Sequence, residues 1–201
     1  MAVNISYYTG KDMKRTIHTS AILQPVPIVL ICAEGEGRAN ITTIGDVAVM
    51  GLNPALIAVS LHEGHLSCRF IEERGRFSFN VPEAGLLDKV DYCGMVSGKE
   101  VDKSELFSLE MVDDTPTVTE CPVSLILSVV NRTQVEQRVI YITEVLRTLV
   151  DERLLKDGKP DLSCLDAVYY GLDNLYYGRG PVIGRGYSEG ASLAEKGNLK
   201  V

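Results

Sequence analysis

"CPVSLILSVVN" (121–131) and "RVIYITEVLRTLVDE" (138–152) are two long runs joined by the polar stretch "RTQVEQ" (132–137). Both runs are rich in β-branched residues, and both are apolar on odd and even positions alike. They therefore predict two β-strands. A strand that is apolar on both sides is covered on both sides, so we expect a core on one side and a helix or a second subunit on the other.

Shorter strands and two helices are predicted upstream of these runs. The predicted strands are "PIVLICA" (27–33), "RANITTI" (38–44), "ALIAVSLH" (55–62) and "FSFNV" (77–81). The turn residues "EGEG" (34–37) make a hairpin of the first two, and "GLNP" (51–54) is a break. Helices are predicted over "LSCRFIEERG" (66–75), ending at Gly75, and around "EAGLLDKV" (83–90). Several strands at hairpin spacing with few helices predict a closed or partly closed antiparallel barrel.

Composition limits the class of protein. A chain of 201 residues is expected to form one domain, with a core over about 20–184 and a glycine-rich tail over 178–201. A net charge of −7 with scattered Lys and Arg argues against nucleic-acid binding. No apolar run reaches ~18 residues, and the N-terminus lacks the apolar region of a signal peptide, so we expect no membrane association and a cytoplasmic location.

The cysteines and histidines do not form a recognisable metal or nucleophile motif. The five cysteines are Cys32, Cys68, Cys93, Cys121 and Cys164. An odd number without a C-x-x-C pair suits a reducing compartment, and we expect buried free thiols. Cys93 could serve as a nucleophile, although nothing local lowers its pKa. In "HEGH" (62–65) the histidines are spaced i, i+3 at a strand end, so no zinc site is expected.

Three stretches could meet a ligand. "GMVSGK" (94–99) looks like a P-loop, but the glycine spacing is one residue short and Glu100 replaces the hydroxyl, which excludes a nucleoside triphosphate site. Ser67 falls in the first turn of a predicted helix, where a hydroxyl and free N–H groups favour an anion, although a helix cap explains it equally well. The tyrosines of "VYYGLDNLYYG" (168–178) could stack on a planar ligand or belong to a core or interface.

The order of segments adds a resemblance. "PVPIVLICAEGEGRANITTI", "NPALIAVSLHEGHLSCRFIEERGRFSFNVP", "DYCGMVSGKEVDK" and "ECPVSLILSVV" together resemble the flavin reductase-like FMN-binding family, and more narrowly its flavoredoxin-type members, from about Pro25 to Gly184. The resemblance implies a mainly β Greek-key split barrel with a few peripheral helices. It further implies a homodimer that holds FMN near its interface and passes electrons between the flavin and NAD(P)H or a small-molecule or protein redox partner.

The resemblance also assigns a site. It implies that Ser67 and Lys103 contact the FMN phosphate. The segment that begins with "GMVSGK" (94–99) would then meet a phosphate after all, through Lys103 rather than through a P-loop. Asn40, Thr42 and Thr43 would contact the ribityl chain and the ring. The full set of implied cofactor-binding residues is Asn40, Thr42, Thr43, Ile44, Gly45, Asp46, Ser60, Leu61, His65, Ser67, Lys103 and Arg138. No metal ligand is implied, and no catalytic residue is assigned.

Two positions depart from the family pattern. Asp46 stands where members often carry Trp, and Arg138 is the nearest equivalent of a His associated with the reactive face of the flavin. The departure at the His position bears on direct NAD(P)H oxidation and not on FMN binding. Three functions are therefore left open: an FMN-binding oxidoreductase or electron carrier, an NAD(P)H:flavin oxidoreductase with flavin as substrate, and a non-enzymatic barrel that binds another ligand or a partner.

Overall fold

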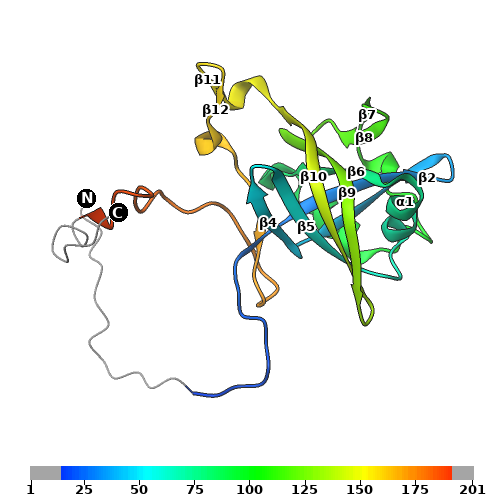
Figure 1. Ribbon diagram of the computed structural model, residues 1–201, viewed down its shortest axis with the longest axis horizontal. Coiled ribbons are helices and arrows are strands. Elements are labelled where there is room, and N and C mark those ends of the chain that lie inside the picture. The colour runs from blue at the N-terminus through cyan, green and yellow to red at the C-terminus, as the bar shows by residue number, and fades with distance from the viewer. Residues whose placement is uncertain (1–14, 192–201) are drawn as a thin grey trace.

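The structure is a computed structural model that describes residues 15–191. Its main feature is a seven-stranded antiparallel sheet of order β3-β2-β6-β9-β10-β5-β4 (Figure 1). The strands are β1 Val26–Pro27, β2 Val29–Gly35, β3 Arg38–Ile44, β4 Val47–Leu52, β5 Ala55–His62, β6 Arg76–Val81, β7 Leu109–Val112, β8 Thr115–Val118, β9 Val123–Val135, β10 Arg138–Val150, β11 Leu155–Lys156, β12 Lys159–Pro160, β13 Tyr169–Tyr170 and β14 Tyr176–Tyr177. The α-helices are α1 Leu66–Arg74 and α2 Leu87–Met95.

A two-residue joint curls the sheet into a barrel. Strands β3 and β4 occupy opposite edges of the sheet, yet only Gly45 and Asp46 separate them in the chain. A link this short requires the two edges to come together. The joint is fixed at both ends, since Val47 N donates to Gly45 O (3.0 Å) and Ser60 N donates to Asp46 O (2.9 Å). The predicted mainly β, partly closed antiparallel barrel is confirmed.

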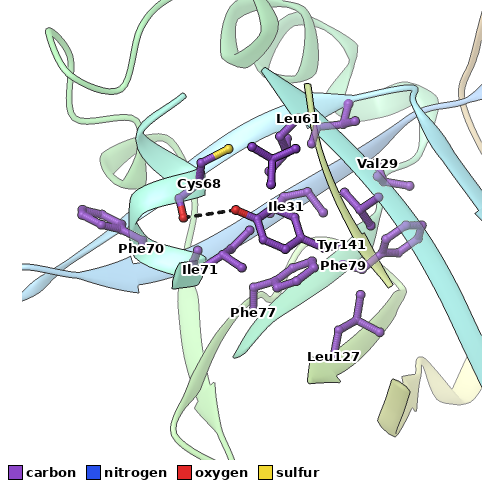
Figure 2. Close-up of a cluster of buried hydrophobic side chains, with 14 of the residues drawn as sticks. Val29, Ile31, Leu61, Cys68, Phe70, Ile71, Phe77, Phe79, Leu127 and Tyr141 are labelled. Atoms are coloured by element: carbon purple, nitrogen blue, oxygen red, sulfur yellow. Dashed lines mark hydrogen bonds between the residues drawn. The ribbon is translucent and has the colours of Figure 1, made fainter. Parts of the chain in front are cut away.

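The barrel interior is filled by apolar side chains from opposite walls. Figure 2 shows Val29 and Ile31 of β2, Phe77 of β6 and Tyr141 of β10 converging on one cluster with residues of α1. Tyr141 is 1% exposed, and its hydroxyl donates to Cys68 O at 3.5 Å (Figure 2). Because strand side chains alternate, the other face of β2 presents Leu30 and Cys32 to a second cluster.

The second apolar cluster lies under α2. Val90 and Cys93 of this helix pack toward Leu30 and Ile41 on the outer face of β2 and β3. Phe107, Val118 and Cys121 complete the cluster from the segments that follow the helix. This packing fixes the C-terminal end of α2 beside the end of β3, which positions the candidate site described below.

The outer face of the long strand β10 is half-buried within a single chain, so its cover by a helix or a second subunit stays a prediction. Within residues 15–191, one side of β10 is buried through Val139, Tyr141 and Thr143, while Ile140 and Ile142 on the other side are half-buried. The predicted connector 132–137 is wrong, because β9 continues to Val135 and only Glu136 and Gln137 form the turn. The hairpin β9–β10 therefore projects from the barrel, as Figure 1 shows.

Most other predicted elements are confirmed. The 34–37 hairpin, the strand over 55–62 and the helix ending at Gly75 are present, and Gly75 adopts the left-handed conformation with φ 65°. The second predicted helix begins later, at Leu87, after a 3-10 turn. Strands β4, β7 and β8 and the short strands β11 to β14 were not predicted from the sequence.

The two ends of the described chain run away from the barrel (Figure 1). Residues 177–191 are all exposed, as expected for the glycine-rich tail, and the part of that predicted tail over 192–201 lies outside the described residues. No helix in residues 15–191 combines the length and the hydropathy needed to cross a bilayer.

Candidate functional site

A cavity of about 720 Å³ opens on the outside of the barrel, beside the joint between β3 and β4. One wall consists of the joint itself and the outward-facing side chains of β5 and β10. Eight of the predicted site residues line it: Thr43, Ile44, Gly45, Asp46, Ser60, Leu61, His65 and Arg138. A cavity of this size lies within the ~300–1,000 Å³ range of small-molecule and cofactor sites.

The opposite wall comes from distant parts of the chain. Ala21 and Leu23 precede β1, whereas Tyr170, Leu172 and Tyr176 belong to the β13–β14 hairpin. The two pieces are tied together, because Leu172 N donates to the Gln24 side chain (2.7 Å). Two of the tyrosines of 168–178 thus border a cavity, with ring centroids 5.1 Å apart. Tyr176 is oriented by donating its hydroxyl proton to Asp91 (2.7 Å).

A second cavity of about 250 Å³ adjoins the first. Thr43, His65 and Gly94 line both cavities, so the two spaces meet at these residues. Thr42, Leu66 and Lys103 line the small cavity, together with the 93–98 segment, which contains the C-terminal end of α2 and the residues after it. The small cavity is bordered by hydroxyls, backbone and an ammonium group, whereas the large one is mostly apolar.

A buried hydrogen-bonded triad lies behind the small cavity. Asn40 Nδ2 donates to Thr42 Oγ1 (3.1 Å) and to Ser67 Oγ (2.8 Å), and the two hydroxyl oxygens are 2.8 Å apart. Each hydroxyl carries one proton and only one can serve the bond between them, so one proton is left over. Ser67 is completely buried, while Thr42 borders the cavity. In the arrangement in which Ser67 donates to Thr42, the remaining proton belongs to Thr42, the member of the pair that borders the cavity.

The second glycine of "GMVSGK" is required by this triad. A Cβ on Gly98 would lie 1.9 Å from Asn40 Oδ1, so only glycine allows the loop to approach this closely. Asn40 Oδ1 is the only buried side-chain N or O atom without a hydrogen bond in the described part of the chain. Arg38 holds the loop in place by donating to Gly98 O (3.0 Å).

Lys103 lies beneath the same loop. Lys103 is 2% exposed, and its ammonium group donates to Cys93 O (3.0 Å) and Val96 O (3.2 Å), the carbonyls at the C-terminal end of α2. Carbonyls at a helix C-terminus carry partial negative charge, which stabilises a cation there. Burial nevertheless lowers the pKa of Lys103 below its ordinary value. Lys103 therefore both closes the end of α2 and presents positive charge to the small cavity.

His65 lies where the two cavities meet, at the N-cap of α1, and its side chain does not cap the helix. Partial burial lowers the pKa of His65, and the neighbouring His62, Lys103 and Lys99 add to the effect. Backbone N–H groups at the start of a helix have no intrahelical acceptor, so the first turn of α1 adds partial positive charge. The surroundings of the small cavity thus favour an anion.

Asp46 and Arg138 form an ion pair at the wall of the large cavity, joining β3–β4 to β10. Arg138 also donates from Nε to Ser60 Oγ (3.2 Å) and from Nη2 to Ser60 O (3.3 Å). These are the two positions that depart from the family pattern by sequence, and the fold brings them into contact.

The other sequence candidates lie outside this arrangement or lack the chemistry. In "HEGH" the imidazole of His62 accepts from Gly64 N (3.0 Å). No group of three or more His, Cys, Asp or Glu side chains is placed to hold a metal ion in residues 15–191. Cys93 is 1% exposed, and burial raises the pKa of its thiol to about 11, so it is a poor nucleophile.

Sequence reasoning missed several residues of the site. Arg38 and Gly98 hold the loop against the triad, and Ile140 and Ala58 line the large cavity. Only Gly98 could have been noticed in the sequence, because it belongs to the glycine-rich stretch "GMVSGK" that does not have the spacing of a P-loop. The others could not be found because their role depends on which strands become neighbours.

Residues 23–179 match the family described as the flavin reductase like domain, which is well over half of the chain. The chain belongs to the flavin reductase-like family. Among flavin reductase-like structures, flavoredoxin from Methanosarcina acetivorans is 32% identical with a TM-score of 0.87, covering 90% of this chain and 99% of that one. Flavoredoxin of Desulfovibrio vulgaris (Miyazaki F) is 28% identical with a TM-score of 0.82, covering 89% and 100%.

The same fold occurs in a more distant protein. A putative flavin reductase with a split barrel domain from Shewanella frigidimarina is 21% identical with a TM-score of 0.72, covering 81% of this chain and 86% of that one. The barrel closed by the Gly45–Asp46 joint is thus the split barrel of the flavin reductase-like family, as the resemblance implied.

Proposed function

We propose that the protein is an FMN-binding oxidoreductase or electron-transfer protein of the flavoredoxin type. The observation that carries this proposal is the pair of adjoining cavities, one large and mostly apolar, the other small and lined in about equal parts by apolar groups and by polar groups that include the Lys103 side chain. FMN has the same division, because an apolar three-ring system is joined by a hydroxylated chain to a phosphate. The ring would occupy the large cavity and the phosphate the small one.

The donor set of the small cavity fits a phosphate. The spare hydroxyl proton of the Thr42–Ser67 pair, the ammonium group of Lys103 and the first turn of α1 all favour anionic oxygens. Asn40 lines neither cavity and its Oδ1 lies against Gly98, so Asn40 would act by orienting the hydroxyls of Thr42 and Ser67, to which its Nδ2 donates. Ser67 would act through Thr42, because Ser67 itself does not border either cavity.

The large cavity fits the ring. The backbone of Thr43 to Gly45 would lie along the polar edge of the flavin, with the apolar surfaces of Ile140 and Leu172 beside the ring system. Bound FMN supplies the redox chemistry. The protein holds the phosphate, orients the ring and sets the electrostatic environment through the Asp46–Arg138 pair.

We further propose that the protein acts as a homodimer. The edge strand β4 exposes three large apolar side chains, Val49, Met50 and Leu52, and β10 exposes Leu146. Exposed apolar side chains on an edge strand favour association. Replacing Met50 and Leu52 with lysine should convert a dimer to a monomer in sedimentation equilibrium.

The five free cysteines support a cytoplasmic location.

An absorption spectrum after reconstitution with FMN and gel filtration tests the proposed function. We expect a yellow protein that retains about one FMN per chain. Loss of the flavin on the column, together with rapid oxidation of NADH or NADPH in the presence of free FMN, would favour a flavin reductase with flavin as substrate. A protein that takes up no FMN would favour a non-enzymatic barrel. Anaerobic titration with NADH and NADPH then tests the electron donor.

A further inference from the structure

The large cavity contains a single pair of charges. Among the residues of 15–191 that line it, Arg138 is the only Lys or Arg and Asp46 the only acid. The rest of the lining is apolar or carries neutral polar groups. A single guanidinium in a mostly apolar cavity is a specific recognition element once its carboxylate partner is displaced, because it distinguishes an anionic ligand from a neutral one of the same shape.

We infer that Arg138 is the subsite for a carboxylate or phosphate on the small molecule that enters the large cavity, and that Asp46 occupies this subsite until the ligand displaces it. This inference rests on the proposed function, since it assigns the charge of the molecule that shares the cavity with FMN. The ligand class is a small, largely apolar molecule with one anionic group.

The guanidinium group of Arg138 is held independently of Asp46. Its Nε donates to Ser60 Oγ (3.2 Å) and its Nη2 to Ser60 O (3.3 Å), so two bonds anchor it to the neighbouring strand β5. The backbone positions are fixed by the pairing of Arg138 with His62 across the two strands. Among the described residues Nη1 has no hydrogen-bond partner, so one edge of the guanidinium can receive a ligand oxygen.

Asp46 can leave without loss of structure. Its side chain is 63% exposed, so the carboxylate returns to water with little desolvation change. Its place in the fold depends on its backbone, since Ser60 N donates to Asp46 O (2.9 Å). Exposed ion pairs contribute little to stability, whereas a ligand carboxylate that gains two parallel bonds and apolar packing is bound more strongly.

The subsite lies in the same cavity as the wall proposed for the flavin ring. Gly45 and Asp46 are consecutive, and Thr43, Ile44 and Gly45 line the cavity together with Arg138. The apolar body of the ligand would meet Leu172 and Tyr170 on the opposite wall. The geometry thus accommodates an anion at one end of the cavity and an apolar body across it.

Calorimetric titration of the full chain with matched probes tests the inference, using benzoate, phenyl phosphate and the neutral benzamide on FMN-saturated and FMN-free protein. We expect benzoate, phenyl phosphate or both to bind at least 10-fold more tightly than benzamide in both forms. Comparison of the two anions identifies whether a carboxylate or a phosphate is preferred. Arg138→Gln should abolish the preference and leave benzamide binding unchanged, which also shows that the cavity is intact.

Asp46→Asn should change anion affinity in the direction opposite to Arg138→Gln. Removing the internal competitor should tighten anion binding roughly 2- to 10-fold, which a merely structural role of Asp46 would not produce. Arg132→Gln is the matched control, because Arg132 lies on the same hairpin but pairs with Glu72 (2.8 Å) outside the cavity, and it should bind like the parent.

Four outcomes would overturn the inference: equal binding of both anions and benzamide, an anion preference that survives Arg138→Gln, weaker anion binding by Asp46→Asn, or loss of anion binding when FMN is present. The last would mean that FMN itself uses Arg138. Failure of the proposed function is distinguishable, because a protein that takes up no FMN but still prefers anions through Arg138 retains the subsite and contradicts only the flavin assignment.

Discussion

The carboxylate of Asp46 accepts a hydrogen bond from the guanidinium of Arg138, 92 residues further along the chain. The pair replaces a tryptophan and a histidine that the resemblance would lead one to expect at these positions. The two departures lie far apart in the sequence, but the fold brings the two side chains into direct contact. The pair is neutral as a whole, so each residue compensates the charge that the other brings to the cavity.

This compensation predicts the reduction potential of bound FMN. At an assumed ~6 Å and an effective dielectric constant near 20, one uncompensated charge changes the energy of a negatively charged reduced flavin by about 2.8 kcal/mol, an upper bound for an exposed group. That corresponds to about 60 mV for a two-electron couple. Asp46→Asn should raise the midpoint potential, and Arg138→Gln should lower it.

The double variant is the control for that experiment, and its potential should return to within ~15 mV of the parent. Spectroelectrochemistry at one pH and two salt concentrations measures all four proteins, and added salt should reduce the differences. Single variants that both lie within ~10 mV of the parent would place the pair away from the ring.

The hydroxyl pair behind the small cavity should distinguish FMN from riboflavin. Thr42→Val keeps the shape of the side chain but removes the proton proposed to face the phosphate, and Ser67→Ala removes the partner that orients it. A hydrogen bond to a charged group contributes about 1.5–3 kcal/mol, so Thr42→Val should weaken FMN binding roughly 10- to 150-fold. Fluorescence titration should show riboflavin binding unchanged, and an equal loss for both ligands would refute the phosphate assignment.

Lys103 should affect stability as well as affinity. Lys103→Ala removes the charge proposed to face the phosphate and also leaves the carbonyls of Cys93 and Val96 without their donor. An unsatisfied buried polar group costs about 1–3 kcal/mol, so the FMN-free variant should be less stable in urea unfolding and bind FMN more weakly. The exposed Lys99 on the same loop is the control, and Lys99→Ala should change stability little. A stable Lys103→Ala protein would show that the carbonyls find other donors.

Gly94, near the end of α2, and Gly98, in the loop that follows, should respond to alanine in opposite ways. Gly98→Ala places a methyl group 1.9 Å from Asn40 Oδ1, and overpacking of this kind typically costs about 1–3 kcal/mol. Gly94 lies in α2, and a methyl group there would be 3.6 Å from Thr43 Cβ, an ordinary contact. Gly94→Ala should therefore be neutral or stabilising through helix propensity. Thermal unfolding of the FMN-free variants measures both, and equal effects would contradict the close approach.

His65 predicts a pH dependence of stability. Because the folded state lowers the pKa of His65, the unfolded chain binds the proton more readily as the pH falls below about 6.5. Stability from this group is therefore present above that pH and is lost as the pH falls. His65→Gln should reduce the loss of unfolding free energy between pH 7.5 and 5.5 in urea titrations. A variant with the full pH dependence of the parent would assign the effect to other groups.

The strands could be predicted from the sequence where burial produces a regular alternation of apolar and polar residues. Strand β5 was predicted with its observed bounds because it alternates between the buried core and the cavity wall. Strand β4 was missed because most of its side chains are exposed and a bulge interrupts its pairing. The end of β9 was missed for a related reason: residues 130–135 are exposed on both faces of a projecting hairpin, so no alternation marks them.

The site shows the same division. Dipole reasoning correctly placed Ser67 in the first turn of a helix, and the resemblance supplied residues that the structure places around two adjoining cavities. The Asp46–Arg138 pair could not be predicted, because it depends on β5 lying between the joint and β10. For Lys103 the sequence and the resemblance indicated only a phosphate contact. Its hydrogen bonds to the carbonyls at the end of α2 could not be predicted, because they depend on where that helix ends.

The joint at Gly45 and Asp46 acts as a tether of fixed length. Three peptide units from Ile44 to Val47 span at most about 11 Å, so the two edges of the sheet cannot separate further whatever enters the cavity. Lengthening this segment would widen the cavity and loosen the barrel together. The opposite wall is not needed to hold the sheet edges together, since residues 21–24 and 169–177 lie outside the seven-stranded sheet. Relatives with new ligands are therefore expected to vary that wall and to conserve the length of the tether.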